Sequence, residues 1–115
     1  MSQPLRIGIA GLGTVGSSLI RALRAKRDFL ADRCGRPIDV VAVSARDRSR
    51  DRGFDLAGLE WFDDPVAMAA NAEIDVFVEL MGGDSGPALD SVRAAIAAGR
   101  HVVTANKALL ARHGT

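Results

Sequence analysis

The stretch LRIGIAGLGTVG, residues 5–16, decides the fold of this chain. Its first half is an apolar run of the kind that forms a strand covered on both faces. That run leads directly into Gly11, Gly13 and Gly16, and residues with helical spacing follow. The triplet G-x-G-x-x-G alone is weak evidence, because a chain with 12 glycines in 115 residues can contain it by chance. A strand before it and a helix after it form the context in which the spacing becomes a specific signal.

Each glycine of the triplet meets a separate physical demand. Gly11 allows a tight turn from strand to helix, Gly13 lets a pyrophosphate approach the backbone without an intervening Cβ, and Gly16 lets the helix pack close to the strand. The N–H groups of the first helical turn then face the phosphates, and the helix dipole adds to the attraction. The stretch therefore predicts a dinucleotide-binding turn.

Strand-like and helix-like segments alternate along the rest of the chain. Apolar runs predict strands over Leu5–Ala10, Ile38–Ser44, 59–62, 75–81 and His101–Thr104. Helical spacing and start signals, such as Asp64 before Pro65, predict helices over 14–30, 65–72, 87–99 and 106–113. This alternation predicts an α/β fold: a Rossmann-type doubly wound parallel sheet, truncated after about five strands, with helices on both faces. Residues 11–16, 44–50, 81–86 and 104–107 then meet beyond the carboxyl ends of the strands, where ligands bind in such sheets.

Two of the predicted helices carry apolar stripes that we expect to be buried. The stripe of 14–30 comprises Val15, Leu19, Ile20, Leu23, Phe29 and Leu30, and that of 87–99 comprises Leu89, Val92, Ala95 and Ile96. We therefore expect the Val15 side chain to belong to the core rather than to a ligand contact.

Composition predicts an ordinary globular protein of the cytoplasm. A net charge of +1 provides no overall field that would favour nucleic acid or a membrane surface. The single cysteine, Cys34, excludes an internal disulfide and fits a reducing compartment. The N-terminus lacks the pattern of a signal peptide, and no apolar run approaches the roughly 18 residues of a membrane span. His101 and His113 have no partner at metal-ligand spacing, so we expect no metal site.

A second strong signal, Thr104-Ala105-Asn106-Lys107-Ala108, follows the last predicted strand. Together with the glycine turn it makes the chain resemble the N-terminal NAD(P)-binding domain of homoserine dehydrogenase. The matching segments are GLGTVG (11–16), ELMGG (79–83), Pro87-Ala88 and GRHVVTANKALLARHG (99–114). Arg100 stands where the family usually has Lys, and Met81 where it usually has Ile; both departures are mild. The resemblance covers nearly the whole chain.

The resemblance implies NAD(P)-dependent interconversion of L-homoserine and L-aspartate 4-semialdehyde, which serves threonine and methionine synthesis. It implies that residues 1–115 form the cofactor-binding domain, and that the substrate and dimerisation domain lies outside this chain. We expect a fragment that is inactive alone and a homodimeric full-length enzyme. Two other readings stay open: another NAD(P)-dependent two-domain dehydrogenase, and a stand-alone NAD(H)-sensing domain without chemistry.

By this resemblance Lys107 is the catalytic candidate, acting on the substrate hydroxyl or carbonyl as general acid/base or as an electrostatic stabiliser. A solvated Lys at a helix N-terminus is the alternative, although a cation there opposes the helix dipole. The candidate cofactor-binding residues are Gly11, Leu12, Gly13, Thr14, Val15, Gly16, Arg46, Arg50, Met81, Gly82, Thr104, Asn106 and Lys107. Val15 contributes through its backbone N–H, and Asn106 can instead cap the last helix.

The end of the second predicted strand bears on the choice between NAD and NADP. NAD enzymes place an acid there, but this chain has Ser44 and Ala45 followed by Arg46. A guanidinium suits a 2′-phosphate, so we expect NADP to be favoured over NAD, with Arg46 first and Arg50 second. A solvated, self-paired loop is the alternative, because RDRSRDR interleaves both signs of charge. Glu79, inside an apolar strand, is either structural or directed to the cofactor cleft.

Overall fold

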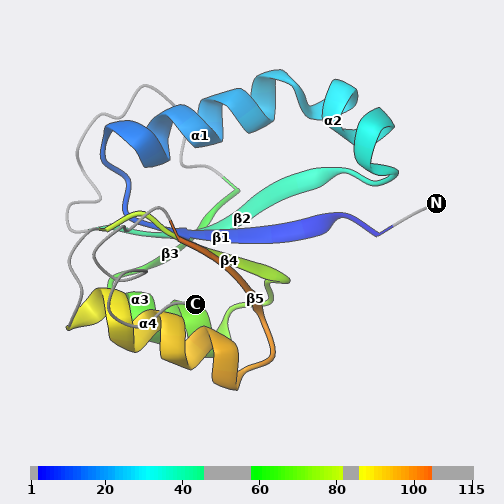
Figure 1. Ribbon diagram of the computed structural model, residues 1–115. Coiled ribbons are helices and arrows are strands. Elements are labelled where there is room, and N and C mark those ends of the chain that lie inside the picture. Colours follow the sequence, from blue (N-terminus) through cyan, green and yellow to red (C-terminus); the bar gives the residue numbers. More distant parts are fainter. Residues whose placement is uncertain (1–2, 46–57, 82–85, 105–115) are drawn as a thin grey trace.

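Within residues 3–45, 58–81 and 86–104, which the computed structural model describes, five parallel strands form one sheet in the order β3-β2-β1-β4-β5. The strands are β1 (Leu5–Ala10), β2 (Ile38–Ser44), β3 (Glu60–Phe62), β4 (Val76–Glu79) and β5 (His101–Thr104). The helices are α1 (Thr14–Ala25), α2 (Arg27–Cys34), α3 (Pro65–Asn71) and α4 (Pro87–Ala97). Helices α1 and α2 cover one face of the sheet, and α3 and α4 cover the other (Figure 1). The predicted doubly wound α/β fold is confirmed.

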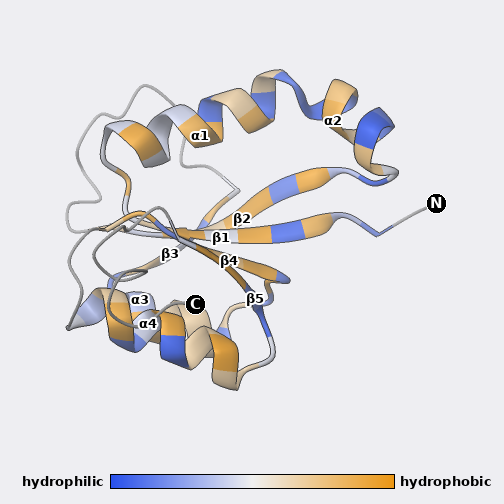
Figure 2. Cartoon of the chain, in the orientation of Figure 1, coloured by the Kyte–Doolittle hydropathy of each residue, from blue (hydrophilic) through white to orange (hydrophobic). Residues whose placement is uncertain are grey.

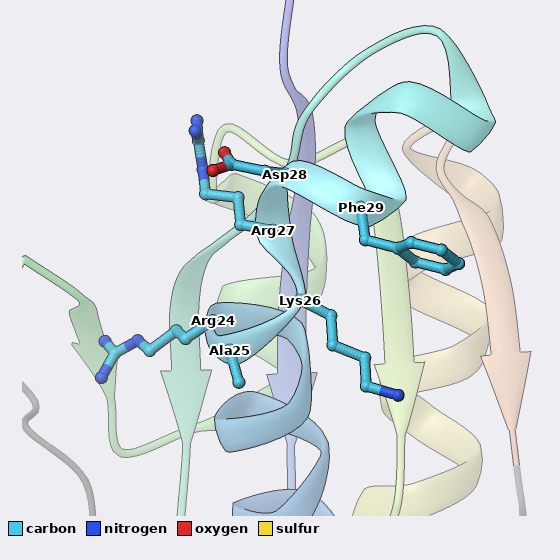
Figure 3. Close-up of a pocket in the computed structure, with 6 residues that line it drawn as sticks. All are labelled: Arg24, Ala25, Lys26, Arg27, Asp28 and Phe29. Carbon is cyan, nitrogen blue, oxygen red and sulfur yellow. The ribbon is translucent and has the colours of Figure 1, made fainter.

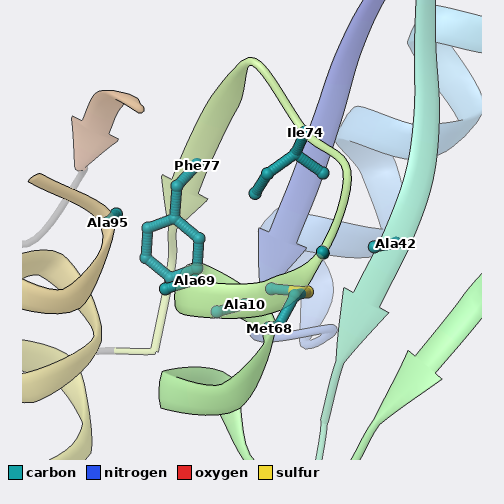
Figure 4. Close-up of a cluster of buried hydrophobic side chains, with 8 residues drawn as sticks. Ala10, Ala42, Met68, Ala69, Ile74, Phe77 and Ala95 are labelled. Atoms are coloured by element: carbon teal, nitrogen blue, oxygen red, sulfur yellow. The ribbon is translucent and has the colours of Figure 1, made fainter. Parts of the chain in front are cut away.

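Alternate residues of the strands supply two separate cores, one on each face of the sheet. On the α1 face, Ile7 and Ile9 of β1 pack with Ile20 of α1. On the α3–α4 face, Phe77 of β4 and Met68 of α3 form a second cluster, in which alanines allow the helices to approach closely (Figure 4). The strands are mainly hydrophobic along their length (Figure 2), as expected for a parallel sheet buried on both faces.

Local signals set the start of two helices as predicted. The Asp64 side chain accepts a hydrogen bond of 2.9 Å from the Val66 N–H, and Pro65 stands in the first turn of α3. Pro87 likewise begins α4. Gly35, with φ 78°, ends α2 in the left-handed conformation that favours glycine.

The single helix predicted over 14–30 is wrong, because the chain breaks at Lys26 into α1 and α2. The backbone leaves helical geometry there (φ −109°, ψ 22°), in a charged segment without apolar residues to hold it on the sheet. After the break, Arg27 donates a 2.7 Å hydrogen bond to Asp39 of β2. Phe29 is 55% exposed, so it is not part of the buried stripe.

The buried face of α4 also differs from the predicted one. Small residues, Ala88, Ser91 and Ala95, are buried, whereas Ile96 is 62% exposed. Small side chains let α4 lie close to α3, and Ile96 lies outside this buried face of the helix. The helix predicted over 106–113 lies outside the described residues.

A search of the described parts of the chain found no helix with the length and apolar character needed to cross a membrane.

Candidate functional site at the carboxyl edge of the sheet

The last residues of neighbouring strands form one row across the sheet. Ala10 of β1 pairs with Ser44 of β2 on one side and with Glu79 of β4 on the other, and Glu79 pairs with Thr104 of β5. Four strands therefore end at the same level, at the edge where parallel α/β sheets bind ligands. The sequence segments expected to converge there each begin at this row or within two residues of it.

Gly11 makes the turn out of β1 in a conformation that side chains disfavour. Its φ is 103°, and a Cβ there would lie 2.9 Å from the carbonyl carbon and oxygen of Leu80. The Gly11 N–H donates to the Ser44 oxygen at 2.8 Å, and the Leu80 N–H donates to the Ala10 oxygen at 2.8 Å. The turn is thus fixed between the ends of β2 and β4, and only glycine fits it.

Gly16 lets the first turn of α1 rest directly on this turn. A Cβ at Gly16 would collide with the Gly11 carbonyl oxygen. The next residue, Ser17, is buried and donates a 3.1 Å hydrogen bond from Oγ to the Leu12 oxygen. Ser17 was not singled out from the sequence, although a hydroxyl beside a glycine in the first turn of a buried helix is the signal that could have found it.

Gly13, by contrast, faces open space. Within the described residues, and apart from the two chain neighbours of Gly13, no atom lies within 4 Å of the position that a Cβ would occupy there. Gly13 is the N-cap of α1, and no side chain caps that helix end. The first N–H groups of any α-helix lack partners within the helix, so this end offers donors and the positive end of the dipole to an anion. The three glycines therefore fit a pyrophosphate: two close the turn beneath it and one leaves room above.

Val15 lies at this exposed helix end and not in the core. Its side chain is 64% exposed, which corrects the expectation that it packs inside the protein. In the first turn of α1 the face that would continue the apolar stripe turns toward the edge of the sheet. Thr14 is also exposed, so both residues border the open space next to Gly13.

Glu79 connects the ends of β4 and β5. It is fully buried, its Oε2 accepts a hydrogen bond from the Met81 N–H at 2.5 Å, and its Oε1 accepts one from the Thr104 hydroxyl at 2.6 Å. The sequence left open a structural role or a place in the cleft, and the structure puts the carboxylate at the carboxyl edge itself. The pairing follows from strand register, which sequence reasoning did not use.

Five candidates lie outside the described residues, and their roles remain predictions. They are Arg46, Arg50, Gly82, Asn106 and Lys107. The described candidates, residues 11–16 together with Met81 and Thr104, all lie at the carboxyl edge.

A shallow hollow elsewhere on the surface does not belong to this edge. It is lined by the consecutive residues Arg24, Ala25, Lys26, Arg27, Asp28 and Phe29, at the junction of α1 and α2. Their side chains spread in different directions rather than converging (Figure 3). No group of three or more potential metal ligands occurs in the described parts of the chain.

The clearest electrostatic perturbation lies at the opposite, amino end of the sheet. Asp75 accepts hydrogen bonds from the Arg6 guanidinium and from the Arg6 backbone N–H, and these bonds hold the pKa of its carboxyl below the usual value. Such a pair fixes strand ends; it is far from the glycine turn along both β1 and β4.

Comparison with known proteins agrees with this geometry. Residues 11–115 match the family model described as the NAD binding domain of homoserine dehydrogenase. A homoserine dehydrogenase of Pseudomonas aeruginosa is 44% identical over 114 residues, which is 97% of this chain and 25% of that protein. The chain thus spans about a quarter of the length of the curated relatives that it matches.

Solved structures give the same result. The homoserine dehydrogenase from Thiobacillus denitrificans superposes with a TM-score of 0.86 at 40% identity, over 97% of this chain and 26% of that one. The S. aureus homoserine dehydrogenase at pH 7.5 gives a TM-score of 0.84 at 33% identity, over 96% of this chain and 28% of that one. The chain therefore belongs to the homoserine dehydrogenase family and corresponds to its NAD-binding domain.

Proposed function

We propose that this chain binds a nicotinamide dinucleotide at the carboxyl edge of its sheet. The observation that carries the proposal is the contrast among three glycines: Cβ atoms at Gly11 and Gly16 would strike the protein, whereas Gly13 faces open space at an uncapped helix end. A pyrophosphate seated there would accept from the first N–H groups of α1.

The order of the strands supports one direction for the bound cofactor. In doubly wound sheets the ribose of the adenosine half is read at the end of the strand next to β1, here β2, so the adenosine lies toward Ser44. The nicotinamide half then extends across the switch point between β1 and β4, toward Glu79 and Thr104.

In the intact gene product we assign to this domain the cofactor-binding part of the NAD(P)-dependent interconversion of L-homoserine and L-aspartate 4-semialdehyde, in threonine and methionine biosynthesis, and we expect the domain alone to be inactive. The family membership supports this reaction. When bound, the cofactor supplies a site that takes or returns a hydride. The chain's own residues hold the pyrophosphate and orient the ring, and Lys107, by resemblance to the family, acts on the substrate oxygen. We place this work in the cytoplasm and in a homodimer.

The proposal extends to a preference for NADP over NAD. Ser44 and Ala45 provide no carboxylate at the end of β2 to accept from a ribose 2′-hydroxyl. Arg46 directly follows them, with Arg50 four residues later, and a guanidinium pairs well with a 2′-phosphate.

The test is titration of the intact gene product with NADPH and NADH, before and after Arg46→Ala. We expect tighter binding of NADPH, and a loss of NADPH affinity in the variant with little change for NADH. Equal or tighter binding of NADH, or equal weakening of both, would refute the preference. Lys107→Ala is expected to lower kcat for homoserine oxidation at least a hundredfold. An unchanged kcat would remove Lys107 from the chemistry.

A further inference from the structure

Glu79 is a buried carboxylate that neither the glycine turn nor the packing of the core requires. It stands in the otherwise apolar run VFVEL and is the one charged side chain that is buried in the described parts of the chain. Burying a carboxylate carries a large desolvation cost unless hydrogen bonds compensate. An apolar residue would fill the same strand position without that cost, which points to a role beyond packing.

Two hydrogen bonds of Glu79 involve the edge of the sheet. One carboxylate oxygen accepts from the N–H of Met81, where the chain leaves β4, and the other accepts from the hydroxyl of Thr104, the last residue of β5. Glu79 and Thr104 are also register partners across the two strands. The carboxylate therefore fixes the relative position of two strand ends.

The bond to Thr104 also fixes the direction of a proton. In this bond the Thr104 hydroxyl donates and the Glu79 carboxylate accepts, so the hydroxyl points its proton at Glu79. Toward any further group, the Thr104 oxygen can then act only as an acceptor. A hydroxyl that would otherwise rotate is thus given a defined polarity.

We infer that Glu79 is a positioning residue that presents Thr104 as a hydrogen-bond acceptor to the nicotinamide riboside half of the cofactor. This inference rests on the proposed function, which places that half beyond β4 and β5. The riboside offers matching donors, namely the ribose hydroxyls and the carboxamide NH₂. The adenosine half lies toward β2 and does not meet this pair.

Glu79→Gln tests the inference because it keeps the shape of the side chain but replaces one accepting oxygen with a donating NH₂. The amide oxygen can still accept from the Met81 N–H, so the amide NH₂ is left facing Thr104. Thr104 must then accept from Gln and turn its own proton outward. The substitution preserves two hydrogen bonds and reverses the polarity that Thr104 presents to the cofactor.

The measurement is the dissociation constant of the intact gene product for three probes: the nicotinamide dinucleotide that it binds more tightly, ADP-ribose and ADP. We expect Glu79→Gln to lower the affinity for the dinucleotide about three- to tenfold and to leave the affinity for ADP unchanged. A parallel loss for ADP-ribose would support a contact to the ribose, and an unchanged ADP-ribose a contact to the carboxamide. Equal weakening of all three probes, or of none, would overturn the inference.

Thr104→Val provides a second variant if Glu79→Gln does not fold, because it removes the hydroxyl and keeps the branched shape. The same pattern among the three probes is expected for it, and weakening of ADP would contradict the inference. Ser91→Ala is the matched control, since the Ser91 hydroxyl is also buried but bonds within α4, to the Ala88 oxygen. It is expected to change none of the three constants. If the unaltered protein binds neither dinucleotide, the proposed function itself fails, and the inference falls with it.

Discussion

At the amino end of the sheet arginine side chains hold the strands together, whereas at the carboxyl end glycines and an uncapped helix leave backbone groups exposed. Arg6 bonds Asp75, Arg27 bonds Asp39, and Arg36 bonds the carbonyls of Gln3 and Pro4. At the other end, the N-cap of α1 is a glycine without a side-chain bond. The amino end is held by bonds from arginine side chains, and at the carboxyl end the first N–H groups of α1 have no partner within the helix.

The comparison teaches that stability and binding can be changed separately in this domain. Substitutions at the amino end are expected to lower the free energy of unfolding without changing cofactor affinity. Substitutions in the glycine turn are expected to affect affinity, and stability only where a new Cβ strikes the protein.

Gly16→Ala should have the largest effect, because it should lower both the stability of the fold and the affinity for the dinucleotide. The new Cβ would collide with the Gly11 carbonyl oxygen, so the turn or the helix must move. We expect a loss of about 3 kcal/mol in the free energy of unfolding, as for strong overpacking, together with loss of detectable dinucleotide binding. Chemical denaturation and titration with NADPH measure the two effects. Unchanged stability would show that α1 does not rest on Gly11 as described.

Arg100→Ala should lower stability alone. The guanidinium donates hydrogen bonds to the carbonyl oxygens of Ala69, Ala70, Ala72 and Ile74, where α3 ends and the chain enters β4. Leaving these carbonyls without their partner is expected to cost about 2 kcal/mol. The measurement is again chemical denaturation, with dinucleotide affinity unchanged.

Two further variants sharpen the result for Arg100. Arg100→Lys should be intermediate, because an ammonium is a point charge with fewer donors than the guanidinium fork. Arg93→Ala, on the exposed surface of α4, is the matched control and should change stability by less than about 0.5 kcal/mol. A drop in dinucleotide affinity in Arg100→Ala, with stability retained, would break the separation between the two ends of the sheet.

Gly13→Ala should lower dinucleotide affinity and leave stability nearly unchanged, the reverse of the pattern expected for Arg100→Ala. Among the described residues its Cβ meets no atom within 4 Å beyond the chain neighbours, and the backbone at Gly13 is extended, with a negative φ of −72°. Stability should therefore change by less than about 0.5 kcal/mol, while dinucleotide affinity falls about tenfold because the methyl group occupies space needed by the pyrophosphate. Unchanged affinity in this variant would argue against a pyrophosphate at this position.

Asp75→Asn should have the smallest effect, and that effect should depend on pH. Because Arg6 lowers the pKa of the Asp75 carboxyl in the folded protein, the ionised carboxylate stabilises the fold above its unfolded-state pKa of about 3.9. This contribution is lost as the pH falls through the lower folded-state pKa. The variant should thus be less stable than the unaltered protein at pH 7, and the difference should shrink toward pH 3 in denaturation curves. Glu73→Gln is the control: this side chain is 92% exposed and lies 3.7 Å from Arg6, so its loss should change stability little. A stability difference for Asp75→Asn that grows toward acid pH would contradict the stabilising role of the Arg6–Asp75 pair.

Local chemistry explains which parts of the fold the sequence predicted. β1, the glycine turn and the Asp64–Pro65 start of α3 depend on neighbours within a few residues, so the pattern is visible in the chain itself. The break at Lys26 brings Arg27 to Asp39, 12 residues away, and no helical spacing reveals it. The exposure of Val15 depends on where the helix lies on the sheet.

The candidate site shows the same division. Gly11, Gly13 and Gly16 could be assigned from spacing, because their roles are backbone roles within one turn. The bond between Glu79 and Thr104 joins residues 25 positions apart and requires the register of β4 against β5. Sequence reasoning identified both residues but could not pair them.

The central claim is that the dinucleotide lies across the carboxyl edge of the sheet, over the glycine turn. Backbone amide NMR of the intact gene product, titrated with NADPH, tests it most directly. We expect shift changes at Gly13, Thr14 and Val15, with further changes at Ala45 and Met81, and none at Arg6, Asp75 or the hollow around Lys26. Changes concentrated at that hollow or at the amino end of the sheet, with the glycine turn unaffected, would contradict it.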